Sequence, residues 1–346
     1  MILRLYDERL LQPSPPWCLE SAERLAAVVQ RLQQTGLWGE LTPLEFSPAP
    51  WEQLLWVHED WYLEDLEQVS AGGGALPPPD LAVTAHTWEL ACLAAGACLA
   101  AAEAVTTGPD LAALCLVRPP GHLALPARAR GFCLLNNCAL AAEAALRSGA
   151  ARVALVDLDC HHGEGLQEVF YARGDVLYLS IHQLDLFPGT GTVDELGLDA
   201  GLGLNVNVPL PPGARGEHYR RAWEELFAPL LRRYAPDVLI VAAGYDAHWR
   251  DPLTDMGLTA DDFHALLTGC TQVAGECCSG RLLVALEGGY DPEALARCAQ
   301  ATVHALLGEP PAEPEAPPPP LHPTQQARVE EYLEHALAQH HLRLRL

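Results

Sequence analysis

The sequence contains no lysine. All 21 basic residues are arginines, and against 45 acidic residues they leave a formal net charge of −24. The missing lysine excludes a Schiff-base mechanism and a P-loop that contacts phosphate through its lysine. The acidic balance argues against nucleic acid as a partner, because phosphates require a positively charged surface. It suits a cationic partner, but a solvated acidic surface that maintains solubility is the simpler interpretation.

Long apolar runs and C-x-x-C cysteine pairs are also missing. The longest apolar stretch, residues 90–102, is Ala-rich and too short to span a bilayer, and the first residues lack a signal-peptide pattern. The 11 cysteines include no C-x-x-C pair, and several lie in apolar runs where a buried thiol is expected. We therefore expect a soluble, cytoplasmic protein with no membrane partner.

The residues that are present alternate in the manner typical of an α/β domain. Hydrophobic residues make up 49% of the 346 residues and charged residues 19%, which is enough for one large core. Runs rich in leucine and β-branched residues predict buried strands at 2–6, 113–117, 152–156, 176–181, 204–208, 238–242 and 282–286. Helices are predicted between them at 22–34, 88–105, 139–147, 218–234 and 261–277. This alternation predicts right-handed crossovers and one mostly parallel sheet.

The C-terminal part has a different composition. It begins with a Pro-rich stretch that is predicted to be extended rather than helical. The last residues have an apolar stripe at Val329, Leu333 and Leu337, which predicts an amphipathic helix that could take part in a homodimer contact. The chain then divides into a main domain, a linker and a C-terminal helix, over 1–307, 308–323 and 324–346.

Polar and glycine-rich segments follow the predicted strands and suggest a metal site. Ligands of parallel α/β sheets bind at the carboxyl ends of the strands. Asp159 and His161 come directly after one strand, two residues apart, so both can point toward one ion. Asp246 follows another strand. One histidine and two carboxylates around an open position can hold Zn²⁺ or Fe²⁺, although strand-end carboxylates also serve as helix caps and loop hydrogen-bond acceptors.

Successive motifs follow one another along the chain: RPPGH at 118–122, GFCLLNN at 131–137, DLDCHHGEG at 157–165, FPGTGT at 187–192, NVPLPPG at 207–213, GYDAHWRDPL at 244–253 and LEGGYD at 286–291. In this order they resemble the histone deacetylase and acetylpolyamine amidohydrolase family, above all its class II-like and bacterial branches. The resemblance covers residues 1–305. It implies the arginase-deacetylase fold, a single α/β domain of three α/β/α layers with a mostly parallel sheet of about eight strands. Residues 1–307 would then form the catalytic domain.

This resemblance implies one catalytic metal ion. Asp159, His161 and Asp246 match the zinc ligands of the family, with Fe²⁺ as an alternative. Related ureohydrolases bind two Mn²⁺ ions through further carboxylates placed two residues after the histidine and the second aspartate. Here those positions are Gly163 and His248, so a second metal lacks ligands.

The resemblance also implies the residues around the metal. Tyr290 matches the hydroxyl that polarises the substrate carbonyl, and His122, oriented by Asp157, matches a proton carrier. The residues that match the tunnel for an acyl-lysine are Gly131, Phe132, Phe187 and Leu253. Those that match a structural K⁺ or Na⁺ site are Asp157, Asp159, His161 and Ser180.

Two positions near the predicted metal site depart from the family pattern, and so does the N-terminal block at residues 17–24, which keeps its Glu and Arg but not its His and prolines. The family usually has two adjacent histidines after R-P-P-G, whereas here His122 is followed by Leu123, which cannot accept a proton. The missing histidine is the family's general base. The family residue that contacts it is an asparagine or aspartate, and this chain has Glu164 there. His122 or Glu164 would therefore have to take the proton.

We predict a zinc-dependent amidohydrolase that removes an acyl group, in the simplest case acetyl, from an acyl-lysine or acylated amine. The missing base should make it slow. Two alternatives stay open: a zinc-binding homologue that recognises an acylated ligand without turnover, and an active deacetylase into which Leu123 was introduced to inactivate it. The retained metal ligands and Tyr290 favour a protein that catalyses a reaction over one that only binds. Where the branch specialised for acetylpolyamines has a glutamate, this chain has Leu253, which favours an acyl-lysine or a small acylamine.

Overall fold

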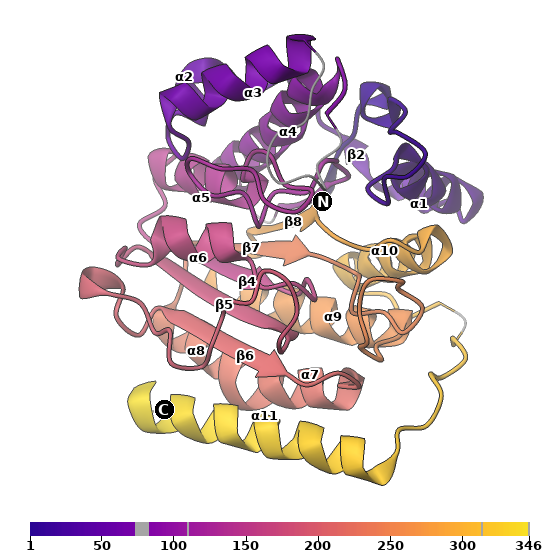
Figure 1. Cartoon of the computed structure of the whole chain (residues 1–346), viewed down its shortest axis with the longest axis vertical. Coiled ribbons are helices and arrows are strands. Elements are labelled where there is room, and N and C mark those ends of the chain that lie inside the picture. The colour runs from indigo at the N-terminus through magenta and orange to yellow at the C-terminus, as the bar shows by residue number, and fades with distance from the viewer. Residues whose placement is uncertain (73–82, 109–110, 313, 345–346) are drawn as a thin grey trace.

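Eight strands form one parallel sheet at the centre of the described chain (Figure 1). The computed structural model describes residues 1–72, 83–108, 111–312 and 314–344. The strands are β1 (Ile2–Leu5), β2 (Thr42–Pro43), β3 (Ala112–Cys115), β4 (Val153–Asp157), β5 (Val176–Gln183), β6 (Asn205–Leu210), β7 (Val238–Ala243) and β8 (Leu282–Leu286). Their order across the sheet is β2-β1-β3-β8-β7-β4-β5-β6.

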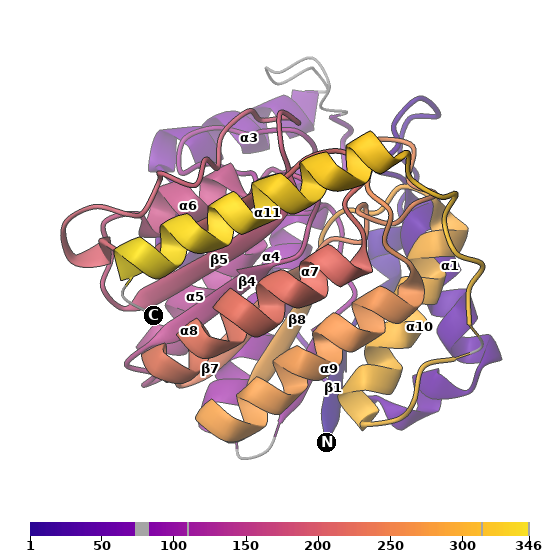
Figure 2. The same ribbon diagram turned by 90° about the horizontal axis from the view of Figure 1, so that it is seen from below.

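Helices cover both faces of this sheet (Figures 1 and 2). They are α1 (Ala22–Gln34), α2 (Trp51–Leu54), α3 (Asp60–Gly72), α4 (Thr87–Thr107), α5 (Asn137–Arg147), α6 (Glu164–Phe170), α7 (Gly216–Ala222), α8 (Ala228–Tyr234), α9 (Ala260–Cys277), α10 (Pro292–Leu307) and α11 (Pro323–Leu344). On one face α4, α5 and α6 pack against the strands, and on the other α9 packs against β7 and β8 between α8 and α10. The predicted three-layer α/β/α fold with a parallel sheet is confirmed.

The predicted strands are all present, and their ends differ from the prediction by at most two residues. β2 was not predicted, because it has only two residues and one is a proline, which cannot donate to a sheet ladder. The predicted helix at 218–234 is interrupted by a π-helical turn at Trp223–Phe227. α10 was also missed, although Asp291 caps its first turn and Pro292 begins it, both typical signals of a helix start.

The apolar stretch at 90–102 lies within the helix predicted at 88–105, which the structure shows as α4 over Thr87–Thr107. By length and composition α4, with 21 residues and a mean hydropathy of 1.6, could cross a membrane. However, 72% of its apolar window is buried inside the protein, where it packs against α5 and the strands β1, β3 and β8. Core helices meet the same criterion of length and composition, and this burial is typical of one.

The C-terminal residues pack onto the edge strand β6. The predicted apolar stripe of Val329, Leu333 and Leu337 is buried in α11. A hydrogen bond of 2.8 Å joins His340 Nε2 to the backbone oxygen of Asn207 in β6. A helix over an edge strand shields its unpaired backbone groups from other chains. The described residues before α11 form neither helix nor strand from 309 to 322, and the division into linker and helix stays a prediction.

His58 is a buried histidine that the fold holds in its neutral form. Its Nε2 accepts the backbone N–H of Asn136 at 2.9 Å, and its Nδ1 lies 3.3 Å from the Pro126 carbonyl oxygen. Burial lowers the pKa of His58 from 6.5 to about 4.

The stability of the protein should therefore fall in acid partly because of His58. Its contribution is complete above the unfolded pKa of 6.5 and is lost as the pH falls through the folded pKa of about 4. The loss amounts to about 3 kcal/mol at most. Urea unfolding at neutral pH and near the folded pKa should show a smaller loss of unfolding free energy for His58→Gln than for the wild type. Equal losses in the two proteins would contradict this assignment.

Candidate metal centre and active site

The predicted metal ligands lie at the carboxyl ends of neighbouring strands. Asp159 and His161 come just after β4, Asp246 follows β7, and Tyr290 follows β8. These strands are adjacent in the sheet, in the order β8-β7-β4. Parallel pairing therefore brings residues that are far apart in the sequence to one rim of the sheet.

Asp159, His161 and Asp246 form a compact set of donor atoms. One donor atom from each lies within 4.8 Å of the others. His161 Nδ1 is 2.7 Å from Asp246 Oδ2 and 3.1 Å from Asp159 Oδ1, and both carboxylates are buried. Gly288 donates its backbone N–H to Asp159 at 2.8 Å, and Cys160 donates to Asp246 at 2.7 Å. The backbone thus fixes both carboxylates beside the histidine.

Two buried carboxylates in this arrangement suit a divalent cation. Burial and the neighbouring Asp159 carboxylate raise the pKa of Asp246 to about 7. Burial alone would lower the pKa of His161, but Asp246 and Asp159 outweigh it and raise that pKa to about 10. A cation would neutralise these buried charges, and an imidazole with two carboxylates is a donor set that both Zn²⁺ and Fe²⁺ accept. The residues present therefore fit a mononuclear metal site.

A second group of metal-ligand types lies close by and has a structural explanation. His122, Cys133 and Glu287 also offer donor atoms within 4.8 Å of one another. However, Glu287 Oε2 already accepts the backbone N–H groups of Gly121 at 2.6 Å and His122 at 3.1 Å, and its Oε1 accepts the thiol of Cys138 at 3.4 Å. Glu287 therefore anchors the segment that carries His122.

His122 is held by a carboxylate on one side and faces the predicted metal ligand Asp159 on the other. Its Nδ1 is 3.1 Å from Asp157 Oδ2, which also accepts the hydroxyl of Tyr178 at 2.9 Å. Its Nε2 is 3.7 Å from Asp159 Oδ1. Burial alone would lower the pKa of His122, but the Asp159 and Asp157 carboxylates outweigh it and raise that pKa. The structure thus brings His122 and Asp157 together as the sequence predicts.

The residues predicted to bind a structural monovalent cation adjoin this pair. Asp157 and Ser180 are partners in register between β4 and β5. Asp157 Oδ1 accepts the backbone N–H of Asp159 at 3.2 Å, and Ser180 Oγ is hydrogen-bonded to His182 Nδ1 at 2.8 Å. His161 Nδ1 is in turn 3.1 Å from Asp159 Oδ1, so the four predicted residues lie next to one another. Binding of K⁺ or Na⁺ there stays a prediction.

Tyr290 has a fixed ring and a fixed backbone beside the predicted metal ligands. Its ring centre lies 5.3 Å from that of Phe132 and 4.8 Å from the guanidinium carbon of Arg24. Its backbone N–H donates to Asp251 Oδ2 at 2.7 Å. Within the described part of the chain, no residue is hydrogen-bonded to the Tyr290 hydroxyl. Burial raises the pKa of Tyr290, so the hydroxyl keeps its proton and can donate to a substrate.

Leu123 is a buried apolar residue at the wall of this site. It is 5% exposed and forms a small cluster with Ala124 and Cys133. Gly131 next to it has a φ of +56°, and a Cβ there would lie 2.9 Å from Leu123 Cδ1 and 3.4 Å from the Phe187 ring. The position where the family has a second histidine is therefore packed between Gly131 and a small apolar cluster.

Glu164, the other candidate proton acceptor, is paired with an arginine. Its Oε2 accepts from Arg130 Nε at 2.9 Å, and the two side chains are 20% and 19% exposed. The Arg130 guanidinium also lies 4.9 Å from the ring centre of Phe187, which is 40% exposed. The Glu164 carboxylate is therefore already engaged with Arg130, whereas Nε2 of His122 faces Asp159.

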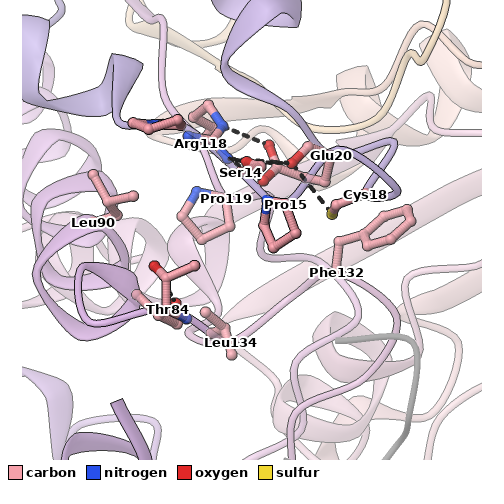
Figure 3. A pocket seen from close by; sticks show the side chains of 12 residues that line it. Ser14, Pro15, Cys18, Glu20, Thr84, Leu90, Arg118, Pro119, Phe132 and Leu134 are labelled. Atoms are coloured by element: carbon pink, nitrogen blue, oxygen red, sulfur yellow. Dashed lines mark hydrogen bonds and ion pairs between the residues drawn. The ribbon is translucent and has the colours of Figure 1, made fainter. Parts of the chain in front are cut away.

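A small pocket borders Phe132 (Figure 3). Its volume is about 40 Å³, and the guanidinium of Arg118 forms its charged wall. That guanidinium donates to both oxygens of Glu20 at 2.8 and 2.7 Å and to the hydroxyl of Ser14 at 2.6 Å. Because its charge is already neutralised, this pocket offers no free charge to a ligand, and we do not place the substrate there.

Three residues that support the site were not predicted: Arg24, Asp251 and Glu287. Arg24 donates to the backbone oxygens of Gly289 and Glu287, both at 2.6 Å. Asp251 Oδ1 accepts the backbone N–H of Leu253 at 2.9 Å. Leu253, a predicted tunnel residue, therefore lies next to the carboxylate that also holds the backbone of Tyr290. Asp251 and Glu287 lie inside the recognised motifs, so a signal existed. A motif does not reveal which backbone group a side chain will hold.

Comparisons with known proteins agree with this geometry. Residues 18–306 match the histone deacetylase domain family. The chain is 40% identical over 291 residues to a histone deacetylase-like amidohydrolase of Pseudomonas aeruginosa, which covers 84% of this chain and 77% of that protein. It is 38% identical over 290 residues to a probable deacetylase of Archaeoglobus fulgidus, covering 83% and 80%. Its fold matches the crystal structure of the HDA15 HD domain with a TM-score of 0.88 at 31% identity, covering 98% and 96%.

Proposed function

Because the chain belongs to the histone deacetylase family, we propose that it is a zinc-dependent amidohydrolase acting on an acylated lysine or amine. One observation carries this proposal: two buried carboxylates and a partly buried histidine converge next to the tyrosine whose hydroxyl has no partner in the described chain. Acetyl is the simplest acyl group for such a site. Leu253 offers no charge to a distal amine, which favours an acyl-lysine over an acetylpolyamine.

The metal ligands and Tyr290 would act on the substrate carbonyl. Asp159, His161 and Asp246 would hold Zn²⁺, which when bound supplies Lewis-acid polarisation of the amide. Tyr290 donates a hydrogen bond to the carbonyl oxygen, and this bond strengthens as negative charge develops there. Because its pKa is raised, the tyrosine remains a neutral donor throughout the physiological range.

His122 is the residue that we propose to move the proton. With Zn²⁺ bound, the Asp159 charge that raises the pKa of His122 would be neutralised. Nε2, with Nδ1 bonded to Asp157, would then accept a proton from the attacking water and pass it to the leaving amine. Leu123 cannot share this task, so one histidine would serve in both steps. A positioned base contributes about 10²–10⁴-fold, and we therefore propose that turnover is slow.

The packing of Leu123 favours a second candidate function. With Ala124 and Cys133 it forms a closed apolar cluster where a second base would otherwise stand. Such a chain could bind zinc and an acylated ligand without hydrolysing it, as a recognition module. Metal binding is common to both functions, and acetate release separates them.

Replacing Tyr290 with phenylalanine should separate catalysis from binding. The variant loses one hydroxyl, and we expect kcat to fall by about 10²–10³-fold with zinc content unchanged. The assay uses zinc-loaded wild type and variant with an acetyl-lysine peptide and an acetylpolyamine, and it measures acetate release. If both proteins bind one zinc and neither releases acetate, the hydrolase proposal fails and the recognition module gains.

A further inference from the structure

Glu315, in the Pro-rich segment, contacts His248 in the loop 246–253, which follows β7. Its Oε2 is 2.9 Å from His248 Nε2 and accepts the backbone N–H of Ala260 at 3.2 Å. The side chains of His248 and Glu315 are 0% and 8% exposed. Residue 315 lies outside 18–306, the region that matches the family, so no family motif accounts for this buried contact.

The rest of this segment is also docked on the main domain. Arg215 donates a hydrogen bond to the backbone oxygen of Pro319. Leu321 packs over Gly213, where a Cβ would lie 2.9 Å from its Cδ2 atom. Glu315 is therefore presented by a segment that is held at several points.

Both ring nitrogens of His248 are bonded within the protein. Nδ1 accepts the backbone N–H of Arg250 at 3.2 Å, so Nε2 carries the proton and donates it to Glu315. His248 lies only two residues after the metal ligand Asp246. The Glu315 bond thus fixes a ring in the loop that begins at that ligand.

The same loop supports Tyr290. Asp251 donates its backbone N–H to the carbonyl oxygen of His248 at 2.8 Å, and its Oδ2 accepts the backbone N–H of Tyr290 at 2.7 Å. A continuous path of hydrogen bonds and short backbone links therefore runs from Glu315 through His248 and Asp251 to Tyr290.

We propose that Glu315 is a positioning residue for the reaction, because it fixes the loop 246–253 that holds Tyr290 in place. Without the carboxylate, the N–H of His248 would be buried with no acceptor, and the loop would have to move or admit water to satisfy it. A displacement of about 1 Å in a catalytic group can reduce a rate by about 10²-fold. The inference rests on the proposed function only for its kinetic readout, since loop order is measurable without turnover.

The test compares Glu315→Ala and Glu315→Gln with Glu309→Ala. Glu309 is a matched control, because its Oε2 is bonded to His304 Nδ1 at 2.8 Å in a pair of the same kind, with Glu309 49% exposed. In Glu315→Ala we expect amide hydrogen exchange in 246–253 and 287–291 to rise by about tenfold or more. We expect kcat to fall by about tenfold, with KM within about twofold of wild type. Glu315→Gln keeps an acceptor oxygen, so its hydrogen exchange and its kcat should both be close to those of the wild type.

Wild-type exchange in 246–253 of Glu315→Ala would overturn the inference, whatever the activity. A fall in kcat that glutamine does not restore, or that Glu309→Ala shares, would overturn it too. If the alanine variant does not fold, Glu315→Asp replaces it, since it keeps the charge but shortens the reach and should change exchange in the same direction. If the wild type releases no acetate, the proposed hydrolase function fails, and the exchange measurements alone decide the role of Glu315.

Discussion

Replacing Leu123 with histidine is expected to raise kcat/KM of the zinc-loaded protein for an acetyl-lysine peptide by about 10²–10⁴-fold. The new imidazole would stand beside His122 and supply a proton acceptor where the wild-type side chain has none. Gly131 borders this position, and a Cβ on that glycine would also lie 3.4 Å from the Phe187 ring, so the new ring would lie at the wall of the site. Initial rates of acetate release near neutral pH measure the change.

Leu123→Asn is the matched control for this gain. Asparagine adds polarity at the same place but cannot act as a base at neutral pH, so kcat/KM should stay within about threefold of the wild type. A polar group beside Ala124 and Cys133 should reduce the unfolding free energy of both variants by about 1–3 kcal/mol, which urea unfolding would reveal. If the Leu123→His variant is folded and binds zinc but is no faster than the wild type, the missing base does not limit the rate of the wild type.

Replacing Asp246 with asparagine is expected to abolish both zinc binding and activity. The amide oxygen can still accept the Cys160 N–H that lies 2.7 Å from the wild-type carboxylate, so the loop should keep its shape. The site loses one of its two negative ligands. We expect zinc affinity to fall by more than about 100-fold, which exceeds the loss typical when only a residue hydrogen-bonded to a metal ligand is replaced. Zinc content after dialysis and competition with a chelator measure this loss.

Asp251→Asn is the matched control for Asp246→Asn. Asp251 is buried close by at 7% exposure, but it holds backbone N–H groups and is not one of the converging donors. The Asp251→Asn variant should retain one zinc but lose activity, because Asp251 no longer holds the backbone of Tyr290 in place. Zinc should raise the thermal midpoint of wild type and Asp251→Asn but not of Asp246→Asn. Stoichiometric zinc in Asp246→Asn would contradict the assignment of the site.

Local sequence patterns were sufficient for most of the sheet. β7 and β8 are continuous apolar runs, because strands buried on both faces need apolar residues at every position. The helix α1 has the bounds that its periodicity predicts. The predictions failed at β2, which is very short, and at the π-helical turn that interrupts the helix between α7 and α8. They also missed α10, although its start signals are typical.

The site was predictable to the extent that it depends on covalent spacing. Asp159 and His161 are two residues apart after a strand, which is enough to place them on one side. Their meeting with Asp246 depends on β4 and β7 being neighbours, and that is a long-range pairing. Family motifs supplied this link for the ligands, but nothing similar existed for Glu315.

The sequence by itself determined the chemistry that is available: three metal-ligand side chains, a tyrosine, one histidine instead of two, and an α/β alternation to present them. Only the tertiary structure decided which groups are already engaged. It pairs the Glu164 carboxylate with Arg130, and it joins Glu315 to His248 across 67 residues. The physical reason is that periodicity and spacing are local properties, whereas the partner of a buried charge depends on how the whole chain packs.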